Sequence, residues 1–204
     1  MDLIFLFFVI ALISMVPVHF VSVEHQNLEK KFGLLRGKRA GSVLGLISGW
    51  GFFVFWAGLW FSTQPRFVVP ILANFSIDIP HIAFGFPLFH VFVFLPFFLT
   101  GAWLGIAGVK ETTLRVAETH MTEKIVSSGV YSLVRHPQYL GGLLAHVGIS
   151  FLLSAWFSLL ATVLMMLLVY LISRKEETEL MKEFGAVYEE YRRNVPMFFP
   201  KLHR

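Results

Sequence analysis

Residues 129–142 read GVYSLVRHPQYLGG, and this stretch decides how the chain is organised. A dense set of polar and aromatic groups here meets the start of a long apolar segment. Pro137 has no backbone N–H and is favoured in the first turn of a helix, and it disfavours helical geometry at the preceding His136. We therefore predict a turn at Arg135 and His136, followed at once by a helix N-terminus.

The predicted helix N-terminus suits an anion, because free N–H groups and the helix dipole both attract negative charge. Tyr131 and Tyr139 add aromatic faces and hydroxyls, and Gly129 permits a close approach of the backbone. An adenosyl or carboxylate-bearing cofactor finds hydrogen-bond donors and a stacking surface in such a place. The alternative interpretation is an arginine that reaches the membrane interface beside a histidine that closes a loop.

A second polar cluster, Arg174-Lys175-Glu176-Glu177, follows the apolar segments 139–154 and 155–172. Carboxylates beside hydrocarbon are costly unless they are paired or functional. These two can bind ribose hydroxyls, an amino group or a cationic centre; the alternative is a solvated start to a surface helix, paired with nearby basic residues. Because the two apolar segments form a hairpin, we predict that both polar clusters meet at one membrane surface and form a single site.

The composition indicates an integral membrane protein. Of the 204 residues 56% are hydrophobic, the mean hydropathy is +0.69, and only 15% are charged, against about 25% in soluble domains. A net charge of +4 can indicate a protein that binds nucleic acid. The basic residues, however, lie in loops between apolar spans, where they determine the orientation of the chain in the membrane. We predict no nucleic-acid partner. The absence of cysteine excludes disulfides and thiolate chemistry, and the eight histidines lack metal-ligand spacing, so we also predict no metal.

The fold class predicted is an all-α integral membrane protein with about five transmembrane helices in a single membrane domain, residues 1–204. A span needs about 20 apolar residues to cross about 30 Å of hydrocarbon. Three N-terminal spans are expected in residues 1–109, at 3–23, 43–62 and 86–109. The first is interpreted as a membrane span rather than a cleaved signal peptide, because no basic region precedes it and no small-residue cleavage site follows it.

The remaining apolar segments, 139–154 and 155–172, are short for full spans, so we expect a tight helical hairpin with almost no connection. The polar segments 24–41 and 110–138 are expected to be inner loops, and residues 63–85 an outer loop. In residues 173–204 the apolar side chains follow one helical stripe, which predicts a C-terminal helix along the membrane surface or over the site. The stripe consists of Phe184, Tyr188, Tyr191 and Val195.

The basic residues predict the orientation of the chain. Segments 24–41, 110–138 and 173–204 hold 16 of the 17 lysines and arginines, and only Arg66 lies elsewhere. Since inner loops are enriched in Lys and Arg, the N-terminus is expected outside and the C-terminus in the cytoplasm, together with both polar clusters. The absence of cysteine and the 23 phenylalanines favour a prokaryotic plasma membrane.

Residues 120–201 resemble the isoprenylcysteine carboxyl methyltransferase family, and related membrane phospholipid methyltransferases share part of the pattern. Residues 1–110 match only as apolar spans. The resemblance rests on a combination of features: the run 129–139, the apolar hairpin, Glu176-Glu177, Phe184-Gly185, Tyr188, Tyr191, Val195-Pro196 and Pro200.

The resemblance implies an integral membrane enzyme that moves a methyl group from S-adenosylmethionine to a lipophilic acceptor, by default a prenylcysteine-type carboxylate. It places the catalytic part in residues 110–204 and assigns catalytic roles to Arg135 and Glu177, the latter to orient the cofactor or face the acceptor. The cofactor site that it implies consists of Glu123, Lys124, Ile125, Val126, Tyr131, His136, Pro137, Gln138, Tyr139 and Glu176.

One departure from the family pattern concerns the acceptor. The family usually places an arginine four residues before the first glutamate, where it is thought to meet the acceptor carboxylate. That position is Ile172 here, and the nearest arginine, Arg174, is turned about 200° away on a helix. A phospholipid, an amine headgroup or a small thiol therefore stays open as the acceptor.

Two further classes compete with a methyltransferase. The tail architecture also resembles that of membrane sterol reductases, which use NADPH, although a nicotinamide cofactor would need more basic groups for its extra phosphate. The third class is a non-enzymatic membrane protein that keeps the scaffold for transport or assembly.

Overall fold

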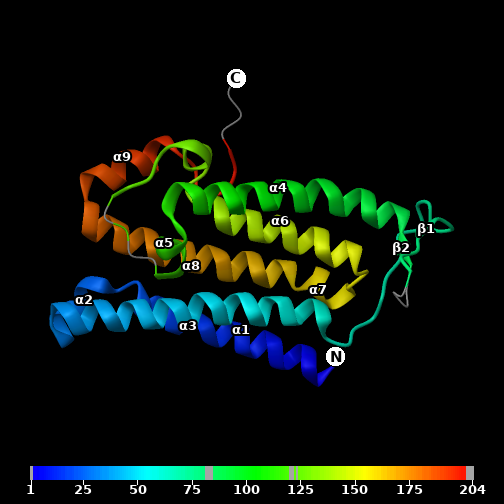
Figure 1. Cartoon of the computed structure of the whole chain (residues 1–204), viewed down its shortest axis with the longest axis horizontal. Helices are drawn as coiled ribbons and strands as arrows, with labels where there is room; N and C mark the ends of the chain where they lie inside the picture. The colour runs from blue at the N-terminus through cyan, green and yellow to red at the C-terminus, as the bar shows by residue number, and fades with distance from the viewer. Residues whose placement is uncertain (1, 81–84, 120–121, 123, 201–204) are drawn as a thin grey trace.

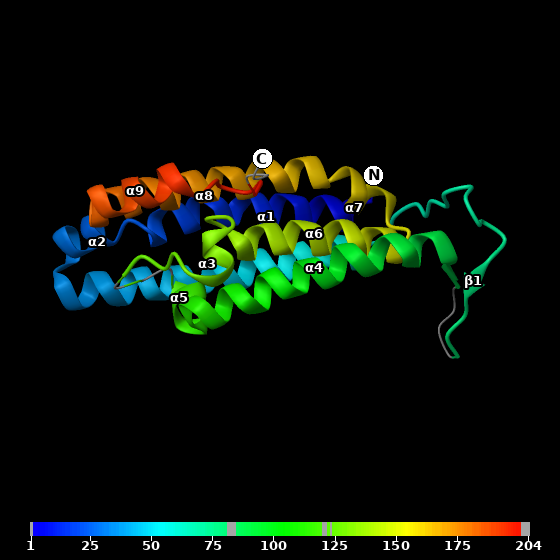
Figure 2. The ribbon, with the colours of Figure 1, turned by 90° about the horizontal axis from the view of Figure 1, so that it is seen from above.

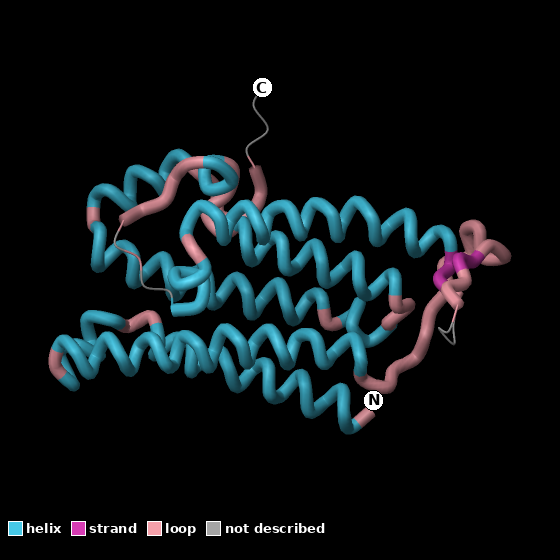
Figure 3. Tube along the Cα trace, viewed as in Figure 1, coloured by secondary structure: helices cyan, strands magenta, loops and turns pink. Residues whose placement is uncertain are grey.

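The structure is a computed structural model, and it describes residues 2–80, 85–119, 122 and 124–200. These residues are mostly helical with almost no sheet, so the predicted all-α membrane class is confirmed (Figure 3). The helices are α1 Leu3–Ser22, α2 His25–Phe32, α3 Leu34–Phe61, α4 Leu88–Thr112, α5 Leu114–Thr119, the 3₁₀ helix η1 Gly129–Ser132, α6 Pro137–Leu152, α7 Trp156–Leu160, α8 Thr162–Phe184 and α9 Ala186–Asn194. The strands β1 Ser76–Ile77 and β2 Phe86–Pro87 form a small antiparallel pair.

The long helices α1, α3, α4, α6 and α8 run side by side along the long axis of the molecule (Figures 1 and 2). Helix α4 packs on α6, α1 packs on α3, and α8 contacts both α1 and α6. The short helices α2, α5 and α9 gather at one end of this bundle, and the β1–β2 pair lies at the other end (Figure 1). The polar segments of the sequence therefore share one end of the bundle.

Three of the described helices, α1, α3 and α4, are long and apolar enough to cross a membrane. Large apolar side chains stay exposed along them, as at Phe7, Phe53 and Trp103, which suits a surface that faces lipid rather than water. Helix α6 has 16 residues, and α8 is apolar only in its first half. The expected total of five spans therefore stays a prediction.

Helix ends differ from the boundaries that polarity predicted. Helix α3 begins at Leu34 rather than near residue 43, and α8 continues without a break from the apolar segment to Phe184. These helices begin or end beside glycines in left-handed conformations, Gly33 with φ +80° and Gly185 with φ +53°, which other residues adopt only with strain. A helix ends where the backbone must turn and does not end merely because its side chains become polar.

Three expectations are corrected as a result. The segments expected to be loops contain α2, the start of α3, α5 and η1. The turn at Gly185 divides the predicted stripe, so that Phe184 ends α8 whereas Tyr188 and Tyr191 lie on α9. The hairpin connection is also longer than predicted, because it contains the short helix α7.

Glycines let α4 and α6 approach closely. A Cβ atom built on Gly101 would lie 2.5 Å from the carbonyl oxygen of Gly141 and 2.9 Å from the backbone nitrogen of Ala145. A Cβ on Gly105, one turn later on α4, would meet nothing within 4 Å. The close packing of small residues at Gly101 sets the position of the α6 N-terminus relative to α4.

Toward the end of the bundle away from the polar clusters, His146 forms hydrogen bonds that connect three helices. Its Nδ1 atom accepts hydrogen bonds from the indole N–H groups of Trp56 at 2.8 Å and Trp60 at 3.1 Å, and its Nε2 atom lies 2.9 Å from the carbonyl oxygen of Ser158. Because Nδ1 accepts, Nε2 carries the proton and donates. This network, in which His146, Trp56 and Ser158 are buried and Trp60 is partly buried, joins α3, α6 and α7.

The glycine contact yields a matched pair of substitutions. We expect Gly101→Ala to destabilise the protein by about 1–3 kcal/mol, because its methyl group must displace the α6 backbone. Gly105→Ala should be neutral or stabilising, since it adds a good helix former in open space. Thermal unfolding of the detergent-solubilised variants, followed by circular dichroism, measures both. Equal melting temperatures for the two variants would contradict the close α4–α6 contact.

Candidate active site

The N-terminus of α6 forms one wall of the site. Pro137 occupies the first helical position, and His136 precedes it with the non-helical angles φ −124° and ψ 62°, as the sequence predicts. The backbone N–H of Arg135 donates to the carbonyl oxygen of Pro196 at 2.9 Å, and that of His136 donates to Met197 at 3.3 Å. The segment that follows α9 therefore holds the turn before α6 in place.

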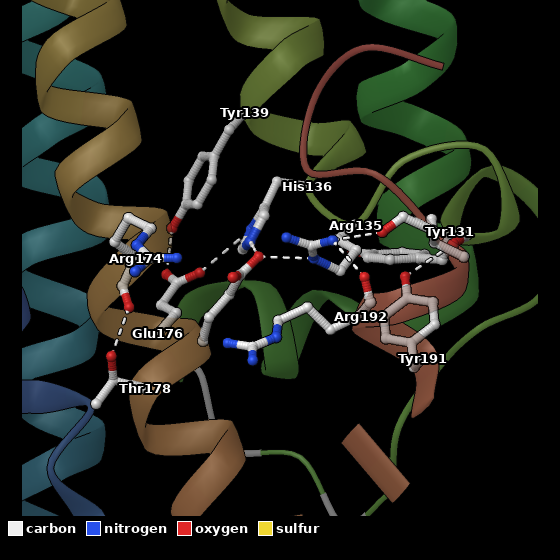
Figure 4. Close-up of polar contacts among 11 residues, drawn as sticks. Tyr131, Arg135, His136, Tyr139, Arg174, Glu176, Thr178, Tyr191 and Arg192 are labelled. Carbon is white, nitrogen blue, oxygen red and sulfur yellow. Dashed lines mark hydrogen bonds and ion pairs between the residues drawn. The ribbon is translucent and has the colours of Figure 1, made fainter. Parts of the chain in front are cut away.

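The second polar cluster meets this turn from α8, so the hairpin brings the two clusters together as predicted. The Arg135 guanidinium donates through Nε to Glu177 Oε1 at 2.7 Å, and His136 Nε2 lies 3.2 Å from the same oxygen. Glu177 is only 2% exposed. Figure 4 shows Arg135 and His136 converging on the same carboxylate.

Arg135 also holds α9. Its Nη1 group donates to the carbonyl oxygen of Arg192 at 3.1 Å and to that of Val195 (Figure 4). The last carbonyls of a helix have no partner inside the helix and carry partial negative charge, so a cation is favoured there. One guanidinium thus joins the turn before α6, the carboxylate on α8 and the end of α9.

Glu176 is the carboxylate that faces the pocket. The Tyr139 hydroxyl donates to its Oε1 atom at 2.5 Å, and His19 Nε2, from α1, lies 3.0 Å from that oxygen. His136 Nδ1 lies 3.6 Å from Oε2. The His136 imidazole therefore sits between the two glutamates, and its ring stacks on Tyr139 with ring centres 5.8 Å apart.

The environment shifts several pKa values. Burial alone would raise the pKa of Glu177, but the hydrogen bonds from His136 and Arg135 outweigh it and lower that pKa below 4.5. Burial raises the pKa of Tyr131 to about 12, and burial also raises the pKa of Tyr188 and of Tyr191. At neutral pH Glu177 is therefore ionised, and these phenols keep their protons as hydrogen-bond donors.

A pocket of about 170 Å³ opens beside Glu176, between the α6 turn, α8 and the α1–α2 corner. Most of the residues predicted to bind the cofactor line this pocket. They are Lys124, Ile125, Val126, Tyr131, His136, Gln138, Tyr139 and Glu176. At its α4 side the Gln138 amide donates to the hydroxyls of Thr112 and Tyr131, each at 3.3 Å.

The other predicted residues have different positions. Pro137 does not line the pocket and is buried as the start of α6. Glu177, predicted to be catalytic, also lies outside the lining, whereas Arg135 contributes to it. Glu123 lies outside the residues that the structure describes.

The pocket also has walls that the sequence analysis missed. Glu179, Leu180 and Glu183 follow Glu176 by three, four and seven residues, so helical spacing placed them on the same face and could have found them. Val23 and His25 from the α1–α2 corner, like His19, carry no local signal, because only tertiary packing brings α1 beside α8.

The charges of the lining limit what the pocket can bind. Three carboxylates line it, at Glu176, Glu179 and Glu183, whereas among the described residues its formal cations are Lys124 and Arg135. The Arg135 charge is already balanced by Glu177, and Glu179 forms ion pairs with Lys175 and Lys182, so the acidic character of the lining comes mainly from Glu176 and Glu183. Such a lining favours a ligand with a positive centre and disfavours one with several phosphate charges.

Comparison with known proteins gives one family and two relatives. A model of the phospholipid methyltransferase family matches residues 85–187. The chain is 39% identical over 73 residues to methanethiol S-methyltransferase 2 of Bradyrhizobium diazoefficiens, an alignment that covers 36% of this chain and 27% of that protein. It is 31% identical over 100 residues to the protein-S-isoprenylcysteine O-methyltransferase of Schizosaccharomyces pombe, which covers 47% of this chain and 41% of that protein.

The chain therefore spans less than half the length of these two curated relatives. The family match covers half of the chain and includes α4, α6, α8 and the loop between the first two. The chain belongs to the phospholipid methyltransferase family, as its resemblance to the related isoprenylcysteine carboxyl methyltransferases predicted.

Proposed function

We propose that this protein is an integral membrane methyltransferase that transfers a methyl group from S-adenosylmethionine to a lipophilic acceptor. The observation that carries the proposal is the Glu176 carboxylate, held by Tyr139 at the edge of a pocket whose charged lining is mainly acidic. Bound S-adenosylmethionine supplies an electrophilic methyl group on a positively charged sulfur. A carboxylate-rich pocket offsets that charge. The amide and hydroxyl groups of the pocket can form hydrogen bonds with the polar groups of an adenosyl and amino-acid ligand.

In this proposal the chain holds and orients the two reactants. Glu176, Gln138 and Tyr131 bind the polar groups of the cofactor, and Tyr139 and His136 present a stacked aromatic face. Residues 124–126 close the pocket from the loop side. Because methyl transfer is an in-line displacement without a covalent enzyme intermediate, catalysis consists mainly of positioning and the exclusion of water.

Arg135 and Glu177 take a supporting role in this proposal. Glu177 lies outside the pocket lining, and its Oε1 atom is bound by both Arg135 and His136. The pair therefore orients the His136 ring and fixes the turn before α6, and Glu177 does not contact the acceptor in this proposal. This assignment explains why two adjacent glutamates differ so strongly in surroundings.

We further propose that the end of the bundle with α2, α5 and α9 faces the cytoplasm, because the segments at that end hold nearly all of the basic residues. The cofactor then enters from the cytoplasm and the acceptor from the bilayer. The proposal keeps one membrane domain with five spans in a prokaryotic plasma membrane, N-terminus outside. Residues 110–204 are its catalytic part, to which α1 adds His19.

The acidic lining argues against the competing cofactor. An NADPH site needs basic groups for its phosphates, and among the described lining residues Arg135 is already engaged by Glu177. A non-enzymatic scaffold, in turn, has no need of a carboxylate that three side chains from two other helices and a turn surround. The methyltransferase is therefore favoured over both.

A specific observation favours an acceptor without a carboxylate. Ile172, at the position where the related family usually has an arginine, is 3% exposed and belongs to the apolar core with Met165, Leu168 and Val169. Arg174 is exposed on another face of α8. A prenylcysteine carboxylate would lack its expected partner, so a small thiol or a lipid headgroup is the favoured acceptor, in line with the similarity to a methanethiol S-methyltransferase.

Calorimetric titration of the detergent-purified protein with S-adenosylhomocysteine tests the cofactor, with NADPH in parallel. We expect micromolar binding of S-adenosylhomocysteine and none of NADPH. Glu176→Gln and His136→Ala should each weaken that binding about tenfold or more, since each removes a charged or hydrogen-bonding partner. Glu190→Gln, at an exposed position of α9, is the control and should bind like wild type. Wild-type affinity in both site variants would refute the proposed site.

Methyl transfer from radiolabelled S-adenosylmethionine tests the acceptor. With protein in lipid nanodiscs, we expect transfer to an alkanethiol to exceed transfer to a farnesylcysteine analogue by at least about tenfold, because the apolar Ile172 replaces the family's arginine and the Arg135 charge is already paired with Glu177. Preferred methylation of the farnesylcysteine analogue would overturn the assignment and restore the carboxylate acceptor. Lipid extracts from the same reaction report any methylated headgroup.

The lowered pKa of Glu177 predicts a pH dependence of stability. A carboxyl with a depressed folded pKa stabilises the protein above its unfolded pKa, near 4.5, and loses that contribution as the pH falls through the folded value. We expect Glu177→Gln to cost about 3–5 kcal/mol near pH 7, because it leaves Arg135 unpaired. The difference in melting temperature from wild type should shrink below pH 4.5. The exposed-site variant Glu190→Gln should show no such change, and a pH-independent difference for Glu177→Gln would contradict the buried ion pair.

A further inference from the structure

We propose that His19, on α1, is a positioning residue that holds the Glu176 carboxylate in its binding orientation. The inference rests on the proposed function, in which Glu176 binds the cofactor. His19 lies outside residues 85–187, the part of the chain that the family model matches. It therefore gives the first helix a role in the site that neither the family match nor the sequence pattern of α1 indicates.

The contact is direct and buried. His19 is 4% exposed, and its Nε2 atom lies 3.0 Å from Glu176 Oε1. The same oxygen accepts the Tyr139 hydroxyl, while His136 Nδ1 lies 3.6 Å from the other oxygen. Groups from α1, from α6 and from the turn before α6 therefore surround one side chain of α8, which restricts its rotamer.

The end of α1 is anchored where this contact is made. The His19 carbonyl oxygen accepts hydrogen bonds from the Ser22 hydroxyl at 2.7 Å and the Val23 N–H at 3.2 Å, which closes the last turn of α1. Just beyond it, Glu24 forms an ion pair with Lys175, the residue before Glu176. Neighbouring residues of α8 are thus held from the same corner of the chain, so α1 cannot move away without breaking both contacts.

A buried histidine is also costly at this position. The buried residues that precede it on α1 are Phe5, Leu12 and Val16, which need no polar partner. A buried imidazole must regain the hydrogen bonds that it loses on leaving water. The Glu176 carboxylate, whose Oε1 atom lies 3.0 Å from Nε2, gives the imidazole a polar neighbour, and the same contact keeps the carboxylate pointed at the pocket.

Binding of S-adenosylhomocysteine, measured by calorimetry, tests the inference without relying on activity. His19→Leu fills similar space without a donor and should weaken binding about tenfold. His19→Gln can place an amide N–H near the position of Nε2 and should bind within about threefold of wild type. The control is His90→Gln, because His90 is a buried histidine of α4 whose contacts, to Phe151, Ser154 and Val69, lie at the other end of the bundle; it should keep wild-type affinity.

A double-mutant cycle shows whether His19 acts through Glu176. The variant His19→Leu/Glu176→Gln should bind no more weakly than Glu176→Gln alone, because the loss is shared. Additive losses would overturn the inference, as would wild-type affinity of His19→Leu or a failure of His19→Gln to restore binding. If His19→Leu does not purify as a folded protein, His19→Asn, whose amide is too short to reach Glu176, takes its place. Absence of binding by the wild type refutes the proposed function itself, and the inference falls with it.

Discussion

The ion pair between Arg135 and Glu177 is the constraint on which the site depends. These residues are 42 positions apart, and their contact fixes the turn before α6 against the middle of α8. The Nη1 group of Arg135 donates to carbonyl oxygens at the C-terminal end of α9, so one guanidinium determines the relative positions of three elements. A buried charge is tolerated only when it is paired, and this requirement makes the arrangement specific: either partner alone would destabilise the fold.

The adjacent residues Glu176 and Glu177 illustrate how a helix separates two roles. Consecutive side chains on a helix point about 100° apart. One carboxylate is therefore directed inward to Arg135 and His136, and the other toward the pocket, where Tyr139 binds it. Because His136 contacts both, the structural ion pair and the pocket carboxylate are joined through a single imidazole ring.

The position of the site follows from the cost of polar groups in hydrocarbon. Charged side chains are expensive within a membrane, so they are gathered where the helices extend past their apolar lengths. Helices α3 and α8 both continue into polar sequence instead of stopping at the change of polarity. At the other end, the buried His90 and His146 are satisfied by neighbouring hydrogen-bonding groups and brace the helices. The closely packed pair α4 and α6 thus gives the pocket a rigid support.

The sequence by itself determined the helical membrane class, the helix start at Pro137, the meeting of the two polar clusters and part of the pocket lining. These features depend on local hydropathy, on proline geometry and on a hairpin that must return to its own end of the bundle. Only the tertiary structure decided which glutamate faces the pocket, that Glu177 is engaged by Arg135, and that His19 reaches Glu176 from α1. Those outcomes depend on the rotation of α8 and on the packing of α1 beside it, and neither is encoded in a local pattern of residues, because long-range contacts set both.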